Sequence, residues 1–132
     1  DLNAHDILVF DALLVRDEFK QKQPDLVLAF LKDYETIAAS FKSDPKEVVA
    51  TMTKFLGVDE AAVMRSLNTF YPVSAREQAT ERWLGKAGSK NSGVVKTLQS
   101  QAQFLFESQQ IVALPKDVSS FVDGSFVAKL AA

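Results

Sequence analysis

The run at residues 7–15 constrains this chain most, because eight of its nine residues are apolar and the ninth, Asp11, is acidic. It lies between Asp6 and Arg16 and shows no helical spacing of polar positions, which is typical of a strand buried on both faces. An ionised carboxylate shut away from water without a partner costs several kcal/mol or changes its pKa. Asp11 therefore either meets a cation, hydrogen-bond donors or a cleft, or marks a strand end that surfaces there.

The predicted strand has no partner in this sequence. No later segment resembles a second strand, and a lone strand can neither satisfy its backbone N–H and C=O groups nor cover its side chains. We therefore expect it to pair with polypeptide outside these 132 residues, or to be exchanged with a second copy of the chain. The sequence also opens on Asp1 without an initiator Met, so we expect a piece of a larger protein.

The remaining residues predict helices. A long helix should begin at Pro24 and end near Lys42, since its apolar residues recur at three- and four-residue steps. Asp44 and Gly57 bracket a second helix, as an N-cap and a closing glycine. Its predicted buried face is Val48, Val49, Met52, Phe55 and Leu56. Further helices are predicted from the N-cap Asp59 to residue 68, over 74–84 and over 94–108, with a loop at 85–93. The expected fold class is mainly α with one N-terminal β-strand.

Composition excludes several classes of function. A content of 47% hydrophobic and 24% charged residues is ordinary for one soluble globular domain. With a net charge of -2 and no run of like charges, nucleic acid is not an expected partner, because binding to phosphates needs clustered Lys and Arg. The longest apolar stretch is too short to span a bilayer. The absence of cysteine excludes disulfides, thiolate catalysis and sulfur-ligated metals.

The sequence offers no convincing catalytic or metal site. His5 is the single histidine, and no serine is marked as a nucleophile that it could activate. Strand alternation would send His5 and Asp11 to one face and Asp6 to the other, which does not favour a metal site. The glycine-rich loop at 85–93 lacks the spacing of a phosphate-binding loop. We predict no enzymatic activity, no metal and no cofactor.

The order of motifs resembles a known family. Val15-Arg16-Asp17-Glu18-Phe19 follows the predicted strand, and Gln23-Pro24-Asp25-Leu26-Val27 opens the long helix. Later motifs in the same order are Leu56-Gly57-Val58, Asn68-Thr69-Phe70-Tyr71, Ser74 to Gln78, Ala102-Gln103-Phe104-Leu105, Ser119-Ser120-Phe121-Val122 and Phe126-Val127. Together they resemble the C-terminal portion of periplasmic solute-binding proteins of the taurine, alkanesulfonate and nitrate class, which serve ABC importers. The resemblance covers nearly all of the chain.

The resemblance implies a fold and a setting. Such proteins have two α/β lobes of the type II arrangement, which close on the solute. Residues 1–132 would form a single partial domain, the C-terminal part of the first lobe, with one strand for its sheet and the helices around it. The implied partners are the membrane subunits of the importer and the missing N-terminal part of the protein, or a strand-swapped copy. The implied location is the periplasm, free or lipid-anchored outside the cytoplasmic membrane.

The resemblance also implies a site. Asp11 matches an acid that meets the ammonium group of the solute in taurine-type members, and Phe10 beside it is the second expected ligand-binding residue. A sulfonate prefers backbone N–H groups at helix N-termini, which would lie in the missing part. Where family members carry an aromatic residue two positions after the acid, this chain has Leu13. The expected function is capture of a taurine-like solute and its delivery to an importer.

Two other hypotheses compete with transport. In the first, the chain is a helical interaction module whose N-terminal strand pairs with another chain, which would make Asp11 incidental. In the second, it belongs to an enzyme related to solute-binding proteins and recruited to thiamine-precursor synthesis. No nucleophile or base in the sequence supports the second.

Overall fold

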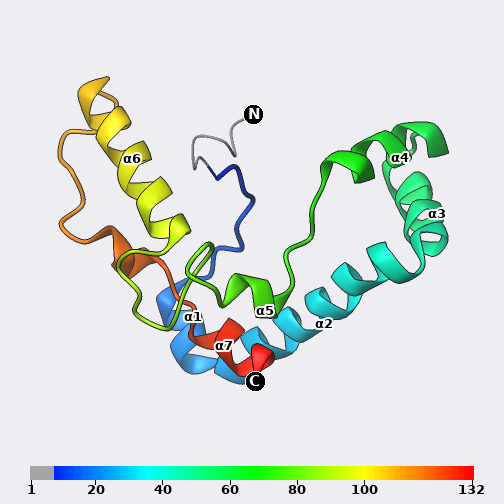
Figure 1. Cartoon of the computed structure of the whole chain (residues 1–132), viewed down its shortest axis with the longest axis horizontal. Coiled ribbons are helices and arrows are strands. Elements are labelled where there is room, and N and C mark those ends of the chain that lie inside the picture. Colours follow the sequence, from blue (N-terminus) through cyan, green and yellow to red (C-terminus); the bar gives the residue numbers. More distant parts are fainter. Residues whose placement is uncertain (1–7) are drawn as a thin grey trace. The chain divides into compact units, whose positions relative to one another are not determined.

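The computed structural model describes residues 8–132, in which every regular element is helical (Figure 1). In chain order these elements are α1 (Asp17–Lys22), α2 (Pro24–Ser43), α3 (Pro45–Leu56), α4 (Glu60–Thr69), α5 (Ala75–Gln78), α6 (Gly93–Glu107), the short 3-10 helix η2 (Val118–Phe121) and α7 (Ser125–Ala131). The chain divides into two compact units. The first unit contains the described residues up to Leu28 together with residues 75–132, and the second contains residues 29–74.

The mainly helical fold class is confirmed, but the predicted strand does not form in the described residues. Residues 8–16 adopt neither helix nor strand, and Ile7 lies outside the described part of the chain. The physical reason is that a strand exists only through a ladder of hydrogen bonds to a neighbour, and no described residue supplies that ladder. We call residues 8–16 the N-terminal segment.

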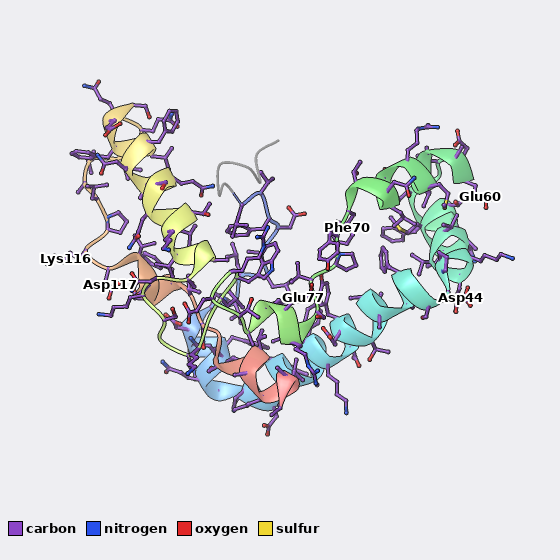
Figure 2. The ribbon with its side chains drawn as sticks, in the orientation of Figure 1. Asp44, Glu60, Phe70, Glu77, Lys116 and Asp117 are labelled. Atoms are coloured by element: carbon purple, nitrogen blue, oxygen red, sulfur yellow. The ribbon has the colours of Figure 1, made fainter. Side chains whose placement is uncertain are left out.

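Local signals in the sequence placed the ends of the helices around Asp44 correctly. α2 begins at Pro24, whose missing N–H costs nothing in the first turn, and it ends at Ser43, one residue beyond the prediction. Asp44 then precedes α3, which begins at Pro45 (Figure 2). α3 ends at Leu56 and is capped by Gly57, which has a φ of 66° and donates its N–H to the Thr53 carbonyl at 3.0 Å. This left-handed conformation is the one that glycine adopts without steric cost.

The second unit packs α3 against α4 around a small core. Its buried apolar side chains are Ala38, Val49 and Val63. The rings of Phe41 and Phe70 lie 5.9 Å apart in a tilted arrangement that aromatic pairs favour. Phe55 is 88% exposed and Leu56 is 53% exposed, so their predicted places in the buried face of α3 are wrong; Leu56 is the last residue of the helix, whereas Phe55 points away from the core. At 3.6 residues per turn, Phe55 lies roughly 120° around the helix from Val49, the residue that is buried.

The first unit brings together the ends of the described chain and the middle helices. α5 packs against α7, and α6 packs against η2. Its buried apolar side chains are Ala75, Val94, Val95, Val118, Phe126 and Val127. These residues come from all four elements, so the core of this unit depends on contacts between segments that are far apart in sequence.

The predicted helix over 74–84 is much shorter in the structure, because α5 ends at Gln78. The chain then turns through residues 79–84, and these turns place two carbonyl groups at the start of α6. The N–H of Gly93 donates to the Glu81 carbonyl at 2.8 Å, and that of Val94 donates to the Trp83 carbonyl at 3.0 Å. A helix that ran to residue 84 would leave these two carbonyls without intrahelical partners, whereas the observed turns pair them with N–H groups at the start of α6.

Candidate functional site

The two predicted ligand-binding residues, Asp11 and Phe10, both lie in the N-terminal segment. Asp11 is exposed, while Phe10 is half-buried. Among the described residues, no backbone hydrogen bond involves residues 8–15, and the first one along the chain joins the Lys20 N–H to the Arg16 carbonyl at 3.0 Å. The carboxylate of Asp11 also forms no ion pair within this part of the chain. Within residues 8–132, therefore, neither the backbone of residues 8–15 nor the Asp11 carboxylate has such a partner.

The side chains of the segment alternate at its beginning. Leu8 and Phe10 are half-buried, whereas Val9 is 76% exposed and Asp11 is exposed as well. Farther along, the alternation is lost, because Leu14 is 95% exposed. One face of the first residues thus packs against the first unit, and Asp11 lies on the other face.

The segment leads into α1, which carries an ion pair with the C-terminal part of the first unit. The Lys20 ammonium lies 2.9 Å from Asp123 Oδ2 and 3.3 Å from Asp17 Oδ1. The hydrogen bond with Asp123 raises the pKa of Lys20, against the partial desolvation that acts to lower it. Desolvation acts to raise the pKa of Asp123, but hydrogen bonds from Ser125 and Lys20 outweigh it and lower that pKa. Both groups are therefore charged at neutral pH.

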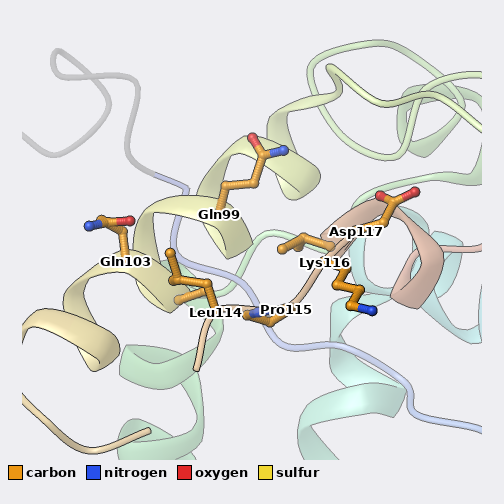
Figure 3. A pocket seen from close by; sticks show the side chains of 8 residues that line it. Gln99, Gln103, Leu114, Pro115, Lys116 and Asp117 are labelled. Carbon is orange, nitrogen blue, oxygen red and sulfur yellow. The ribbon is translucent and has the colours of Figure 1, made fainter. Parts of the chain in front are cut away.

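A shallow recess lies between α6 and the stretch that precedes η2 (Figure 3). It has a volume of about 230 Å³ and is open to solvent. Its lining residues are Gln99, Ala102 and Gln103 from α6, Leu114, Pro115, Lys116 and Asp117 from the facing stretch, and Val118 at the start of η2. Two amides and one charge of each sign could hold a small polar molecule. This recess was not predicted from the sequence, whose only signal for it is the pair of glutamines four residues apart on one helix.

Two of the four polar side chains that line the recess, Asp117 and Gln103, are engaged with their own neighbours. Asp117 Oδ1 accepts hydrogen bonds from the hydroxyl of Ser119 at 2.6 Å and from its N–H at 2.9 Å. These bonds lower the pKa of Asp117. The amide of Gln103 donates to Glu107 at 2.7 Å. The recess is therefore separate from the predicted site, because neither Phe10 nor Asp11 lines it.

Other sequence candidates do not assemble into a site. His5 and Asp6 lie outside the described residues. In residues 8–132 no group of three or more His, Cys, Asp or Glu side chains could hold a metal ion. The start of α6 after the glycine-rich loop already binds the carbonyls of Glu81 and Trp83, so its first N–H groups are taken. No helix in the described range is long and apolar enough to cross a membrane.

Comparison with known proteins gave no further assignment: no protein-family model matches the chain, and neither do any curated protein or solved structure.

Proposed function

We propose that this chain is part of a periplasmic solute-binding protein that captures a small amine-bearing sulfonate, taurine-like in its chemistry, and delivers it to an ABC importer. The observation that carries the proposal is the N-terminal segment, in which a single carboxylate sits in an apolar run whose backbone groups have no partner among the described residues. Backbone N–H and C=O groups of an apolar run need partners, and a sheet supplied by further polypeptide would provide them. The order of sequence motifs supports the same conclusion.

The role proposed for Asp11 follows from its charge and its surroundings. A desolvated ammonium group needs an anionic or carbonyl partner, and a charge-assisted hydrogen bond to a carboxylate is among the strongest available. Asp11 has no ion pair in the described chain, so its carboxylate is free for that role. Phe10 is half-buried on the face that packs against the first unit, opposite to Asp11, so its expected part in the site stays a prediction. The sulfonate would bind to N–H groups of the other polypeptide.

In this proposal the chain performs no chemistry and needs no cofactor. Transport depends on closure of two lobes around the solute, because contacts from both sides favour the closed state and the importer recognises that state. The described residues offer one side of such a cleft, and the other side belongs to polypeptide beyond them.

The substitution Asp11→Asn in the full-length protein tests the proposal. We expect the affinity for taurine, measured by calorimetry, to fall by about tenfold to a hundredfold, since a hydrogen bond to a charged group contributes about 1.5–3 kcal/mol. The affinity for ethanesulfonate, which lacks the amine, should not fall. Asp25→Asn, at an exposed carboxylate in the first turn of α2, is the matched control. An unchanged affinity of Asp11→Asn for taurine contradicts the proposal.

The exposure of the segment also favours a second candidate, a helical interaction module that pairs its N-terminal segment with another chain. Val9 is 76% exposed and Leu14 is 95% exposed, and an added strand would cover both. If the chain is such a module, Asp11→Asn should have little effect on binding of the partner chain. Leu14→Pro should prevent the pairing, because proline cannot donate to a ladder of hydrogen bonds. The two substitutions together separate the two candidates.

A further inference from the structure

The N-terminal segment contacts the first unit at both of its ends. At its beginning, Leu8 packs directly on the backbone at the start of α6. A Cβ atom added to Gly93 would lie 2.8 Å from Leu8 Cδ1, so the glycine leaves the room that the leucine occupies. At its other end, Arg16 is the N-cap residue of α1, and its carbonyl accepts the Lys20 N–H at 3.0 Å.

Lys20 extends this second attachment beyond α1. Its ammonium binds Asp123 Oδ2 at 2.9 Å, across 103 positions of sequence. The two side chains are only 25% and 37% exposed, so water screens the pair less than a fully exposed one. Asp123 is itself held in place, because its other oxygen accepts the N–H of Ser125 at 3.0 Å at the start of α7. Lys20 thus joins α1 to Asp123, a residue whose position is set by its own hydrogen bond at the start of α7.

A second ion pair in α1 is different in kind. Lys22 binds Glu18 at 2.7 Å, but the two side chains are 70% and 78% exposed and lie one turn apart in the same helix. This pair joins α1 to nothing outside it. Between the attachments at Leu8 and Lys20, residues 11–16 are all exposed.

We propose that Leu8 and Lys20 are positioning residues, which hold the two ends of the N-terminal segment on the first unit and so fix the place of Asp11. The role of Asp11 rests on the proposed function, but the two attachments are properties of the chain itself. They can therefore be tested without any solute.

The chain has no cysteine, so a single introduced cysteine can carry a nitroxide spin label whose spectrum reports local mobility. Leu14→Cys places the label in the segment, and Phe55→Cys places it in the second unit as a reference. These side chains are 95% and 88% exposed, so labelling should not disturb a core. Each labelled chain is measured unchanged and with Lys20→Met. Lys22→Met is the matched control, because it removes a lysine from the same helix without removing the contact to Asp123.

We expect Lys20→Met to raise the mobile fraction at position 14 by about two- to fivefold, the range that an ion pair of this kind supports, and to leave position 55 unchanged. Lys22→Met should have no effect, and Lys20→Arg should keep the segment attached because it keeps the cation. Asp123→Asn should act like Lys20→Met, since its remaining oxygen can still accept the Ser125 N–H. Leu8→Ala should also raise the mobile fraction at position 14.

An unchanged spectrum at position 14 in Lys20→Met, or an equal change in Lys22→Met, overturns the role of Lys20. An equal rise at positions 14 and 55 also overturns it, because the effect would then be a general loosening of the chain. No effect of Leu8→Ala overturns the role of Leu8. These results are independent of the taurine titration, so the attachments can fail while Asp11 still binds the amine, and the reverse is equally possible.

Discussion

Gly93 occupies a position in the first unit that no larger residue can fill without moving the backbone. A Cβ atom at this position would overlap the backbone carbonyl oxygen of Arg82, and it would also meet Leu8. A carbonyl in a turn cannot swing aside as the end of a long side chain can. Gly88 presents the opposite case, because a Cβ atom there would meet nothing within 4 Å, but its φ of 78° strains any other residue.

This contrast predicts that Gly93→Ala destabilises the first unit more than Gly88→Ala. Overpacking of a tight site costs typically 1–3 kcal/mol, and we expect Gly93→Ala at the upper end of that range. A left-handed conformation costs an alanine roughly 1–2 kcal/mol. Urea unfolding followed by the fluorescence of Trp83, the only tryptophan and a residue of the first unit, measures both. A smaller loss of unfolding free energy for Gly93→Ala than for Gly88→Ala would contradict this prediction and would mean that the backbone at Arg82 moves at little cost.

The two helix starts in the second unit differ in how they are capped. Both α3 and α4 are preceded by an aspartate, which the sequence marked equally as an N-cap. Asp59 Oδ1 accepts the Ala62 N–H at 2.6 Å, whereas Asp44 makes no such side-chain bond. Pro45 at the first position of α3 lacks an N–H group, so fewer donors there need a cap.

We therefore expect Asp59→Ala to lower the free energy of unfolding by about 1 kcal/mol, the usual cost of a lost N-cap, and Asp44→Ala to lower it by clearly less. Hydrogen exchange of the amides in α3 and α4 locates each loss, since the first turn of α4 should lose protection only in Asp59→Ala. Equal losses in the two variants would mean that the charge near the helix start, rather than the hydrogen bond, provides the stabilisation.

The same comparison shows which parts of the fold can be predicted from the sequence. Pro24, Gly57 and Asp59 act on their own neighbourhood, and the helix ends that they predict are confirmed. The end of α5 at Gln78 was not predicted, because the turns after it bind the start of α6 through the carbonyls of residues 81 and 83, and no local pattern reveals those contacts. The strand failed for a related reason, since its formation depends on a partner that the described chain lacks. Asp11 was recognisable as unusual, while the two attachments that hold its segment come from Gly93 and Asp123, far away in sequence.

At the scale of the whole molecule, apolar side chains are covered poorly. In the described residues 19 large apolar side chains are exposed, against nine apolar residues that are buried, and the buried set is mostly alanine and valine. Single exposed apolar residues are normal, and large exposed apolar patches are typical of interaction surfaces, so this excess is compatible with the proposed covering of the N-terminal segment by further polypeptide. The N-terminal segment contributes four of them, Val9, Leu13, Leu14 and Val15, around Asp11.

A cleft that needs two sides should not bind solute when only one is present. We expect calorimetric titration of residues 1–132 alone with taurine to show no micromolar binding, because one carboxylate in water gains little from an ammonium that stays hydrated. Joining the chain to the rest of its parent should restore binding, since the added polypeptide would desolvate Asp11 and supply donors for the sulfonate. The unmodified parent, titrated under the same conditions, is the reference. Micromolar affinity in the isolated chain would place a complete site within these residues, and the interlobe role of Asp11 would then be wrong.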